Sequence, residues 1–323
     1  MRRVAFTLLI LAALLGGSLA FVFFVYTGIV LDVIADAARD AAGLERKALT
    51  VGDQEVVYLD GGSGQTVILL HGFGANKDLW NGVAARLTPG YRVIVPDLPG
   101  FGESTKREST NYGLKAQAER LHDFLNRLGI EKAHIAGNSM GGAISAVYAA
   151  MYPEGVNSLM IGAAPGAGPS AQADIERLLS SGDNPLLVGD EDDFDRLMEL
   201  AFSSPPSIPG PLKREMAARA IRDERFNAKI FADLLSDWSI DRYLGDISVA
   251  TLIVWGADDR LVNASMAAAF SGGITSSQAE IFDHCGHALP RECPDVLAER
   301  YLAFLAGTHP PTMDAQVSPI PPE

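Results

Sequence analysis

The chain has 323 residues, of which 40 are acidic and 26 basic, so its formal net charge is −14. Apolar residues make up 48% and charged residues 20%, which is globular composition and excludes a chain that is mainly disordered. The acidic balance excludes a nucleic-acid-binding protein, because phosphate contacts need a basic face. Only one stretch is long enough to cross a bilayer, which excludes a multi-span transporter.

That stretch lies at the N-terminus, where residues 4–31 carry no charge. It exceeds the apolar region of about 7–15 residues found in a cleaved secretory signal. Small residues at 18–20 resemble a cleavage site, but five large apolar residues follow them directly. We therefore expect residues 1–31 to form an uncleaved transmembrane anchor, with a cleaved signal and a buried core helix as the alternatives.

The charges that flank this span are nearly balanced. Arg2 and Arg3 precede it, and the first basic residue after it, Arg39, lies eight positions downstream among acidic residues. Since basic residues favour the cytoplasmic side, this distribution favours a cytoplasmic N-terminus and a main domain outside the cytoplasmic membrane.

Small residues recur every four positions within the span, at Ala12, Gly16 and Ala20. Such a stripe lets helix backbones approach closely in lipid, where packing drives association. The stripe predicts a homodimer through the transmembrane helix.

Residues 32–48 are rich in alanine and carry charges at helical spacing, which predicts a juxtamembrane helix ending near Gly43. From residue 49 onward, short apolar runs alternate with amphipathic stretches, and this alternation predicts an α/β core with a mostly parallel sheet. The expected strands are residues 55–59, 66–70, 92–96, 133–136, 156–161, 251–255 and 279–282, with helices at 114–128 and 143–151 among them.

The alternation stops between the two halves of this core, which span residues 49–162 and 246–307. Residues 163–245 look helical and contain a proline-rich break, so we expect an inserted helical cap. Residues 308–323 contain five prolines and little to bury, which predicts a disordered tail.

Residues 137–141 read Gly-Asn-Ser-Met-Gly and stand between an expected strand and an expected helix. In that context Gly-x-Ser-x-Gly is the pattern of a nucleophile elbow. Small residues on both sides of Ser139 permit a sharp turn that exposes its hydroxyl, and the helix N-terminus offers N–H groups to an oxyanion. Ser139 is thus the predicted nucleophile, with a glycine-rich structural turn as the alternative.

A serine hydroxyl needs a general base, and the base needs an orienting carboxylate. The chain order expected with this elbow is serine, acid, histidine. His287, in the loop before the final helix, is the predicted base and His284 its competitor. Asp258 and Asp259 both follow the strand at 251–255, and their spacing leaves the choice of acid open.

The motif His-Gly-Phe-Gly at residues 71–74 follows the strand at 66–70. One oxyanion donor is expected here, from the backbone N–H of Phe73, and another from the backbone N–H of Met140. His71 is expected to hold the loop rather than to act as a second base.

These motifs, with the loop at 97–104, Gly-Ala-Asp-Asp-Arg at 256–260 and Cys-Gly-His at 285–287, resemble the α/β-hydrolase superfamily. Residues 71–80 and the expected anchor are similar to bacterial family V lipases and membrane-anchored phospholipases A. The resemblance implies an α/β-hydrolase fold. It also implies that the acid is Asp259, the fourth residue of the Gly-x-x-Asp-Arg pattern.

The resulting hypothesis is a membrane-anchored serine hydrolase that cleaves acyl esters of lipids through an acyl-enzyme, without a cofactor. By resemblance it would belong to the bacterial cytoplasmic membrane. The alternatives are a meta-cleavage C–C bond hydrolase, which shares Gly-Asn-Ser-Met-Gly-Gly, a small-ester esterase, and a non-catalytic anchored binding protein.

Three weaker patterns leave alternatives open. Apolar residues recur every four positions on an expected cap helix and either pack onto the core or line an acyl channel: Phe226, Ile230, Leu234 and Trp238. The acidic run at 190–195 predicts a solvated loop rather than a calcium site, and no metal-ligand spacing is present. Cys285 and Cys293 are expected to be unpaired thiols unless an oxidising compartment pairs them.

Overall fold

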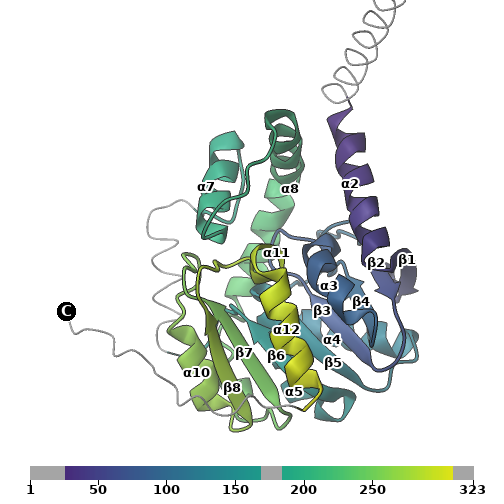
Figure 1. Ribbon diagram of the computed structural model, residues 1–323, viewed down its shortest axis with the longest axis vertical. Helices are drawn as coiled ribbons and strands as arrows, with labels where there is room; N and C mark the ends of the chain where they lie inside the picture. The colour runs from purple at the N-terminus through teal and green to yellow at the C-terminus, as the bar shows by residue number, and fades with distance from the viewer. Residues whose placement is uncertain (1–25, 169–183, 308–323) are drawn as a thin grey trace, which may run out of the picture.

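The computed structural model describes residues 26–168 and 184–307. Its centre is an eight-stranded sheet in the order β1-β2-β4-β3-β5-β6-β7-β8, and β3 to β8 run parallel while β1 and β2 pair antiparallel (Figure 1). The strands are Leu44–Val51 (β1), Gln54–Gly61 (β2), Thr66–Leu70 (β3), Arg92–Pro96 (β4), Ala133–Asn138 (β5), Val156–Gly162 (β6), Thr251–Gly256 (β7) and Ser277–Phe282 (β8). The expected α/β fold with a mostly parallel sheet is confirmed.

Helices cover both faces of this sheet (Figure 1), and the inner parallel strands β3 to β7 are largely buried, whereas the edge strand β8 is partly exposed. Helices α3 and α12 pack together, as do α4 and α5. The core helices are Asn81–Leu87 (α3), Leu114–Arg127 (α4), Met140–Met151 (α5), Met266–Gly273 (α10), Leu289–Glu292 (α11) and Pro294–Leu305 (α12), with short 3-10 turns at Lys77–Trp80 (η1) and Pro153–Gly155 (η2).

The N-terminal boundary differs from the expectation. Helix α2 spans Thr27–Ala41 with Ala42 as its C-cap, and Gly43 follows with a positive φ of 66°, which suits the residue after a helix C-cap. Residues 44–48, which we expected in a juxtamembrane helix, belong to β1 and pair with β2. The sheet therefore begins five residues before the expected boundary at residue 49.

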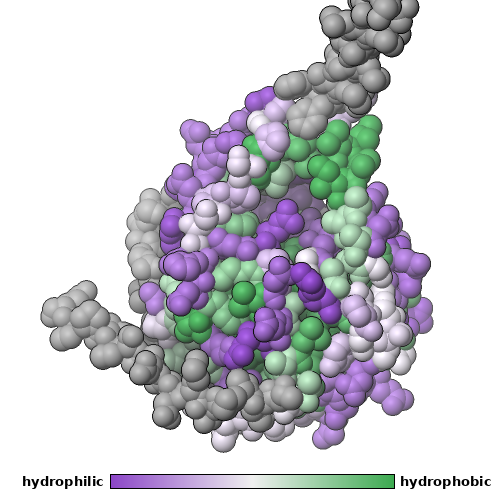
Figure 2. All heavy atoms as spheres, viewed as in Figure 1, coloured by the Kyte–Doolittle hydropathy of each residue, from purple (hydrophilic) through white to green (hydrophobic). Residues whose placement is uncertain are grey.

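Most of the expected anchor over residues 4–31 lies outside the described residues, as do the small-residue stripe and the expected tail at 308–323. In the two ranges that the structure describes, no helix combines the length and the apolar character needed to cross a membrane. Helix α2 and its N-cap residue nevertheless expose four large apolar side chains: Tyr26, Ile29, Val33 and Ile34. Figure 2 shows apolar surface gathered where α2 borders the N-terminal segment.

Among the residues described between β6 and β7, three helices are inserted: Glu191–Ala201 (α7), Gly210–Leu235 (α8) and Asp241–Leu244 (α9). The solvated loop expected at 190–195 is instead the start of α7. Asp190 caps this helix, because its side chain accepts a hydrogen bond from the Asp193 N–H at 2.8 Å. The acidic residues of the first turn also interact favourably with the positive end of the helix dipole. Within the described ranges, no group of three or more His, Cys, Asp or Glu side chains forms a metal site.

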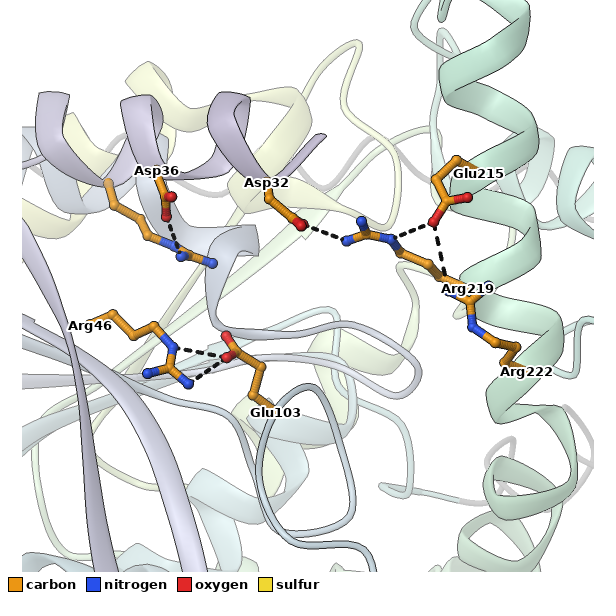
Figure 3. A pocket seen from close by; sticks show the side chains of 8 residues that line it. Asp32, Asp36, Arg46, Glu103, Glu215, Arg219 and Arg222 are labelled. Atoms are coloured by element: carbon orange, nitrogen blue, oxygen red, sulfur yellow. Dashed lines mark hydrogen bonds and ion pairs between the residues drawn. The ribbon is translucent and has the colours of Figure 1, made fainter. Parts of the chain in front are cut away.

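A charged cavity of about 530 Å³ lies between α2, β1 and α8 (Figure 3). Arg219 of α8 donates to the Asp32 carboxylate at 2.9 Å and to the Gly28 carbonyl at 3.0 Å, both on α2. At the other side of the cavity, Arg46 of β1 pairs with Glu103 from the loop after β4. The helix that follows the expected anchor is therefore bonded directly to the longest cap helix.

A buried ion pair joins η1 to the loop after β4. Lys77 is only 2% exposed, and its Nζ contacts Asp97 Oδ2 at 2.9 Å and Glu103 Oε1 at 2.6 Å. The Lys77 N–H also donates to Asp97 Oδ1, at 2.7 Å. Partial burial would raise the pKa of Glu103, but hydrogen bonds from Arg46 and Lys77 outweigh it and lower the pKa to about 2.

We expect Lys77→Met to lower the free energy of unfolding by about 3 kcal/mol, because it leaves the Asp97 carboxylate buried without its cation. Arg86→Met is the matched control, since Arg86 and Asp295 form an exposed pair, and it should cost less than about 1 kcal/mol. Urea unfolding at pH 7 measures both variants. Equal losses would show that the buried pair contributes no more than a surface pair.

Candidate active site

The turn from β5 into α5 is too tight for any side chain at its flanking glycines. A Cβ on Gly137 would lie 2.1 Å from the Gly141 carbonyl oxygen, and a Cβ on Gly141 would lie 2.3 Å from the Leu70 carbonyl oxygen. Ser139, at the apex, has φ +58°, a strained conformation for a residue with a side chain. The local geometry is that of the expected elbow, with a partly exposed serine at the end of a buried strand.

The structure brings His287 and Asp259 into direct contact. The ring Nδ1 lies 2.9 Å from Asp259 Oδ2, and because a carboxylate only accepts, Nδ1 carries the proton in this contact. The Asp259 side chain is fully buried, and its Oδ1 accepts from the backbone N–H groups of Leu261 and Val262, both at 2.9 Å. The carboxylate is therefore held in one orientation, with its second oxygen toward the imidazole.

Asp258 and His284, the alternatives for the acid and the base, take no part in the contact between His287 and Asp259. Asp258 is exposed and accepts from the Ser203 hydroxyl at 2.6 Å, so its carboxylate faces the segment that leaves α7. His284, the competitor for the base, is exposed and occupies a positive-φ position in the turn after β8.

Strands β5, β7 and β8 are parallel, so their carboxyl ends meet at one edge of the sheet and bring the three loops together. Asn138, just before Ser139, donates from Nδ2 to the His287 carbonyl oxygen at 3.1 Å. The Asp258 N–H donates to the Cys285 carbonyl oxygen at 3.0 Å. The sequence did not predict this hydrogen bond between Asn138 and the His287 loop, because the two residues lie 149 positions apart.

The loop after β3 passes directly over the serine. A Cβ on Gly72 would lie 3.0 Å from the Ser139 Cβ and 3.5 Å from its Oγ. His71 is fully buried, donates from Nδ1 to the Gly72 carbonyl oxygen at 2.8 Å, and accepts from the Leu98 N–H at Nε2. Burial lowers the pKa of His71, so its imidazole is neutral. Both ring nitrogens are occupied by hydrogen bonds to the backbone, which fits a role in holding the loop.

An aromatic row extends from this loop toward the inserted helices. The Phe73 ring packs edge-on against Phe101, with centroids 5.7 Å apart, and against Phe231 of α8 at 5.8 Å. Phe231 in turn contacts Trp238 at 6.4 Å. Phe101 and Phe231 were not singled out from the sequence, because only the fold brings them beside Phe73.

All four proposed channel residues pack against the core, with Phe226 and Trp238 only partly buried. Ile230 and Leu234 are essentially fully buried, and the Phe226 ring meets Tyr112 at 5.6 Å. Ile230 also lies so close to Gly100 that a Cβ there would be 2.9 Å from its Cδ1. This arrangement favours the packing interpretation, and an additional acyl-binding role for these residues and Trp238 stays a prediction.

Cys285 and Cys293 form a disulfide with their Cα atoms 6.2 Å apart, which corrects the expectation of unpaired thiols. A spacing of eight residues did not indicate the pairing, since only the turn between them brings the two sulfurs together. The bond closes the short loop that carries His287.

Comparison with known proteins agrees with this geometry. Residues 65–204 match the family described as the alpha/beta hydrolase fold. The chain is 35% identical to Lipase 1 from Psychrobacter immobilis over 82% of this chain and 86% of that protein. It is also 30% identical to the monoacylglycerol lipase ABHD6 of Rattus norvegicus, over 76% and 77% of the two chains.

Among solved structures, a membrane phospholipase A described as a bacterial virulence factor superposes with a TM-score of 0.85. It is 37% identical, and the match covers 95% of this chain and 99% of that one. The chain belongs to the α/β-hydrolase family, and it is a hydrolase.

The geometry separates the two adjacent aspartates, so their amide variants should behave differently. Asp259→Asn should lower kcat for a p-nitrophenyl ester by about 10⁴-fold, because it disturbs the orientation and tautomer of the histidine. Asp258→Asn keeps an acceptor for Ser203 and should cost less than about tenfold. Steady-state kinetics of the two variants measure both values of kcat. A larger loss of kcat in Asp258→Asn than in Asp259→Asn would identify Asp258 as the acid.

Proposed function

We propose that the protein hydrolyses carboxylic esters of lipids with Ser139 as nucleophile, His287 as base and Asp259 as orienting acid. The observation that carries this proposal is the buried Asp259–His287 hydrogen bond at the sheet edge where the strained Ser139 turn also lies. A binding protein on the same fold would need neither this contact nor the strained turn.

In this mechanism Ser139 attacks the ester carbonyl while His287, through Nε2, takes the hydroxyl proton and passes it to the leaving alcohol. Asp259 keeps the proton on Nδ1 and stabilises the imidazolium that forms. The backbone N–H groups of Phe73 and Met140 hold the developing oxyanion. Water then attacks the acyl-enzyme by the same route, and the carboxylic acid leaves.

Two observations support a lipid as the ester. The relatives are named lipase, monoacylglycerol lipase and membrane phospholipase A, and they cover most of this chain. The aromatic row from Phe73 to Trp238 offers an apolar surface beside the serine, which suits an acyl chain. In the proposal the partly exposed cap residues Phe226 and Trp238 extend this surface, and the buried Ile230 and Leu234 support them from behind.

The alternative of a meta-cleavage C–C bond hydrolase shares the elbow sequence. Residues 73–77 read Phe-Gly-Ala-Asn-Lys where that group has a glycine-rich loop, and the uncharged stretch at residues 4–31 suits an anchored enzyme. Hydrolysis of a vinylogous diketone in preference to a p-nitrophenyl ester would favour this alternative. Preference for short over long acyl chains would favour a small-ester esterase.

We further propose that residues 4–31 anchor the protein in the cytoplasmic membrane of a bacterium, with the hydrolase outside the cytoplasm. Two features of the described residues support this: the apolar side chains exposed on α2, and the disulfide, which suits an oxidising compartment. A homodimer through Ala12, Gly16 and Ala20 belongs to the same proposal.

Removal of the nucleophile should abolish turnover without unfolding the protein. We expect Ser139→Ala to lower kcat on p-nitrophenyl butyrate by about 10⁴-fold or more, and His287→Ala to be nearly as severe, because the residues act as a unit. A fluorophosphonate probe should label the wild-type protein on Ser139 and leave Ser139→Ala unlabelled. Undiminished turnover in Ser139→Ala would exclude the mechanism.

The anchor should matter for lipid substrates only. A shortened protein that begins at Tyr26 keeps α2 and β1, so it should retain hydrolysis of water-soluble esters. Without Arg2 and Arg3 its formal net charge is −16, so it should be repelled by anionic vesicles and lose most of its activity on their lipids. Fatty-acid release from vesicles compares the two forms, and equal release would contradict the anchoring proposal.

A further inference from the structure

The carboxylate of Glu292 lies where the inserted helices meet the loop that carries His287. Glu292 ends the short helix α11, one residue before Cys293 of the disulfide. Its Oε2 accepts from the Gly286 N–H at 2.6 Å and from the Ser203 N–H at 3.2 Å, and its Oε1 accepts from the Ser204 N–H at 2.9 Å. One side chain therefore bonds the residue before His287 and two residues just beyond α7.

The same two segments are joined again on the other side of His287. The Ala288 N–H donates to the carbonyl oxygen of Ala201, the last residue of α7, at 2.9 Å. Gly286 and Ala288, which flank His287 in the chain, are thus both held to the segment at 201–204, one through Glu292 and one directly. The backbone on both sides of His287 is therefore linked by hydrogen bonds to this cap segment.

Gly286 is packed too closely against Ser203 and Glu292 to carry a side chain. A Cβ on Gly286 would lie 2.5 Å from the Ser203 backbone nitrogen and 2.9 Å from Glu292 Oε2. The disulfide between Cys285 and Cys293 closes the loop at its base, so Glu292 and Gly286 face each other within a covalent ring. A shift of Glu292 would be transmitted to Gly286 rather than absorbed by the loop.

The contact requires a carboxylate in particular. Both oxygens accept from backbone N–H groups, and an ionised carboxylate accepts at both without offering a donor. Glutamine at this position would turn an NH₂ group toward one of the N–H donors, whichever way its amide is placed. The substitution nearly preserves volume while it breaks one side of the junction.

We infer that Glu292 is a positioning residue that sets the place of His287 relative to Asp259 and couples it to the cap segment at 201–204. The inference rests on the proposed function, since it concerns the base of that mechanism. Displacement of a catalytic group by about 1 Å can cost on the order of 100-fold in rate, so loss of this contact acts on the chemical step.

The test compares Glu292→Gln and Glu292→Ala with Glu299→Gln, a matched control on α12 whose side chain is exposed. With p-nitrophenyl butyrate, Glu292→Gln should lower kcat by about 10- to 100-fold and leave KM within about twofold. Labelling of Ser139 by a fluorophosphonate should slow by a similar factor, because it also needs the base. The control should match the wild type in all three quantities.

A purely structural role would produce a different pattern. A raised KM with unchanged kcat and unchanged labelling rate would mean that Glu292 only holds the cap, and would overturn the inference. So would a lowered melting temperature with full activity at 25 °C. If Glu292→Ala fails to fold, Glu292→Gln alone decides these outcomes.

Hydrogen exchange of the full-length wild-type protein tests the contact without any measure of activity. The amides of Gly286, Ser203 and Ser204 should exchange slowly, and Glu292→Gln should speed exchange in both segments. Fast exchange of Gly286 in the wild type would overturn the inference. A wild type that neither hydrolyses esters nor reacts with the fluorophosphonate would instead refute the proposed function. Hydrogen exchange would in that case still show whether Glu292 protects the amides of Gly286, Ser203 and Ser204.

Discussion

The tight turn between β5 and α5 is the constraint on which the rest of the site depends. The carbonyl of Gly141 approaches Gly137, and the carbonyl of Leu70 approaches Gly141, at distances that exclude any side chain. The serine at the apex is forced to a positive φ, and it stands at the edge of the sheet where β3, β7 and β8 also end. Because the turn is determined by backbone contact, the hydroxyl is presented without help from a flexible loop.

The other two groups rely on long-range hydrogen bonds. Asp259 is oriented by two backbone N–H groups, and the loop of His287 is bonded to Asn138, to the Asp258 N–H and to Glu292. A disulfide closes that loop, and the segment beyond α7 lies against it. On the opposite side of the inserted helices, Arg219 bonds α8 to α2. The cap is thus tied both to the loop of the proposed base His287 and to helix α2.

The sequence predicted the inner parallel strands well because they are buried on both faces and read as short apolar runs. The strands at 66–70 and 92–96 have the expected bounds. It failed at β1, whose run of three consecutive charged residues at 45–47 follows an alanine-rich helix and resembles its continuation. Spacing alone did not separate Asp258 from Asp259, and only the family resemblance chose between them. Asn138 and Glu292 escaped notice because their partners lie far away in the chain.

The central claim is that an acyl group passes from a lipid ester to Ser139. The full-length protein can be mixed with dioleoyl phospholipid vesicles, quenched in acid within the first turnovers, digested and examined by mass spectrometry. The account predicts an oleoyl adduct on the peptide that contains Ser139, which disappears as the substrate is exhausted. Release of oleate with an adduct on another residue, or with none at any time in the wild type, would contradict it.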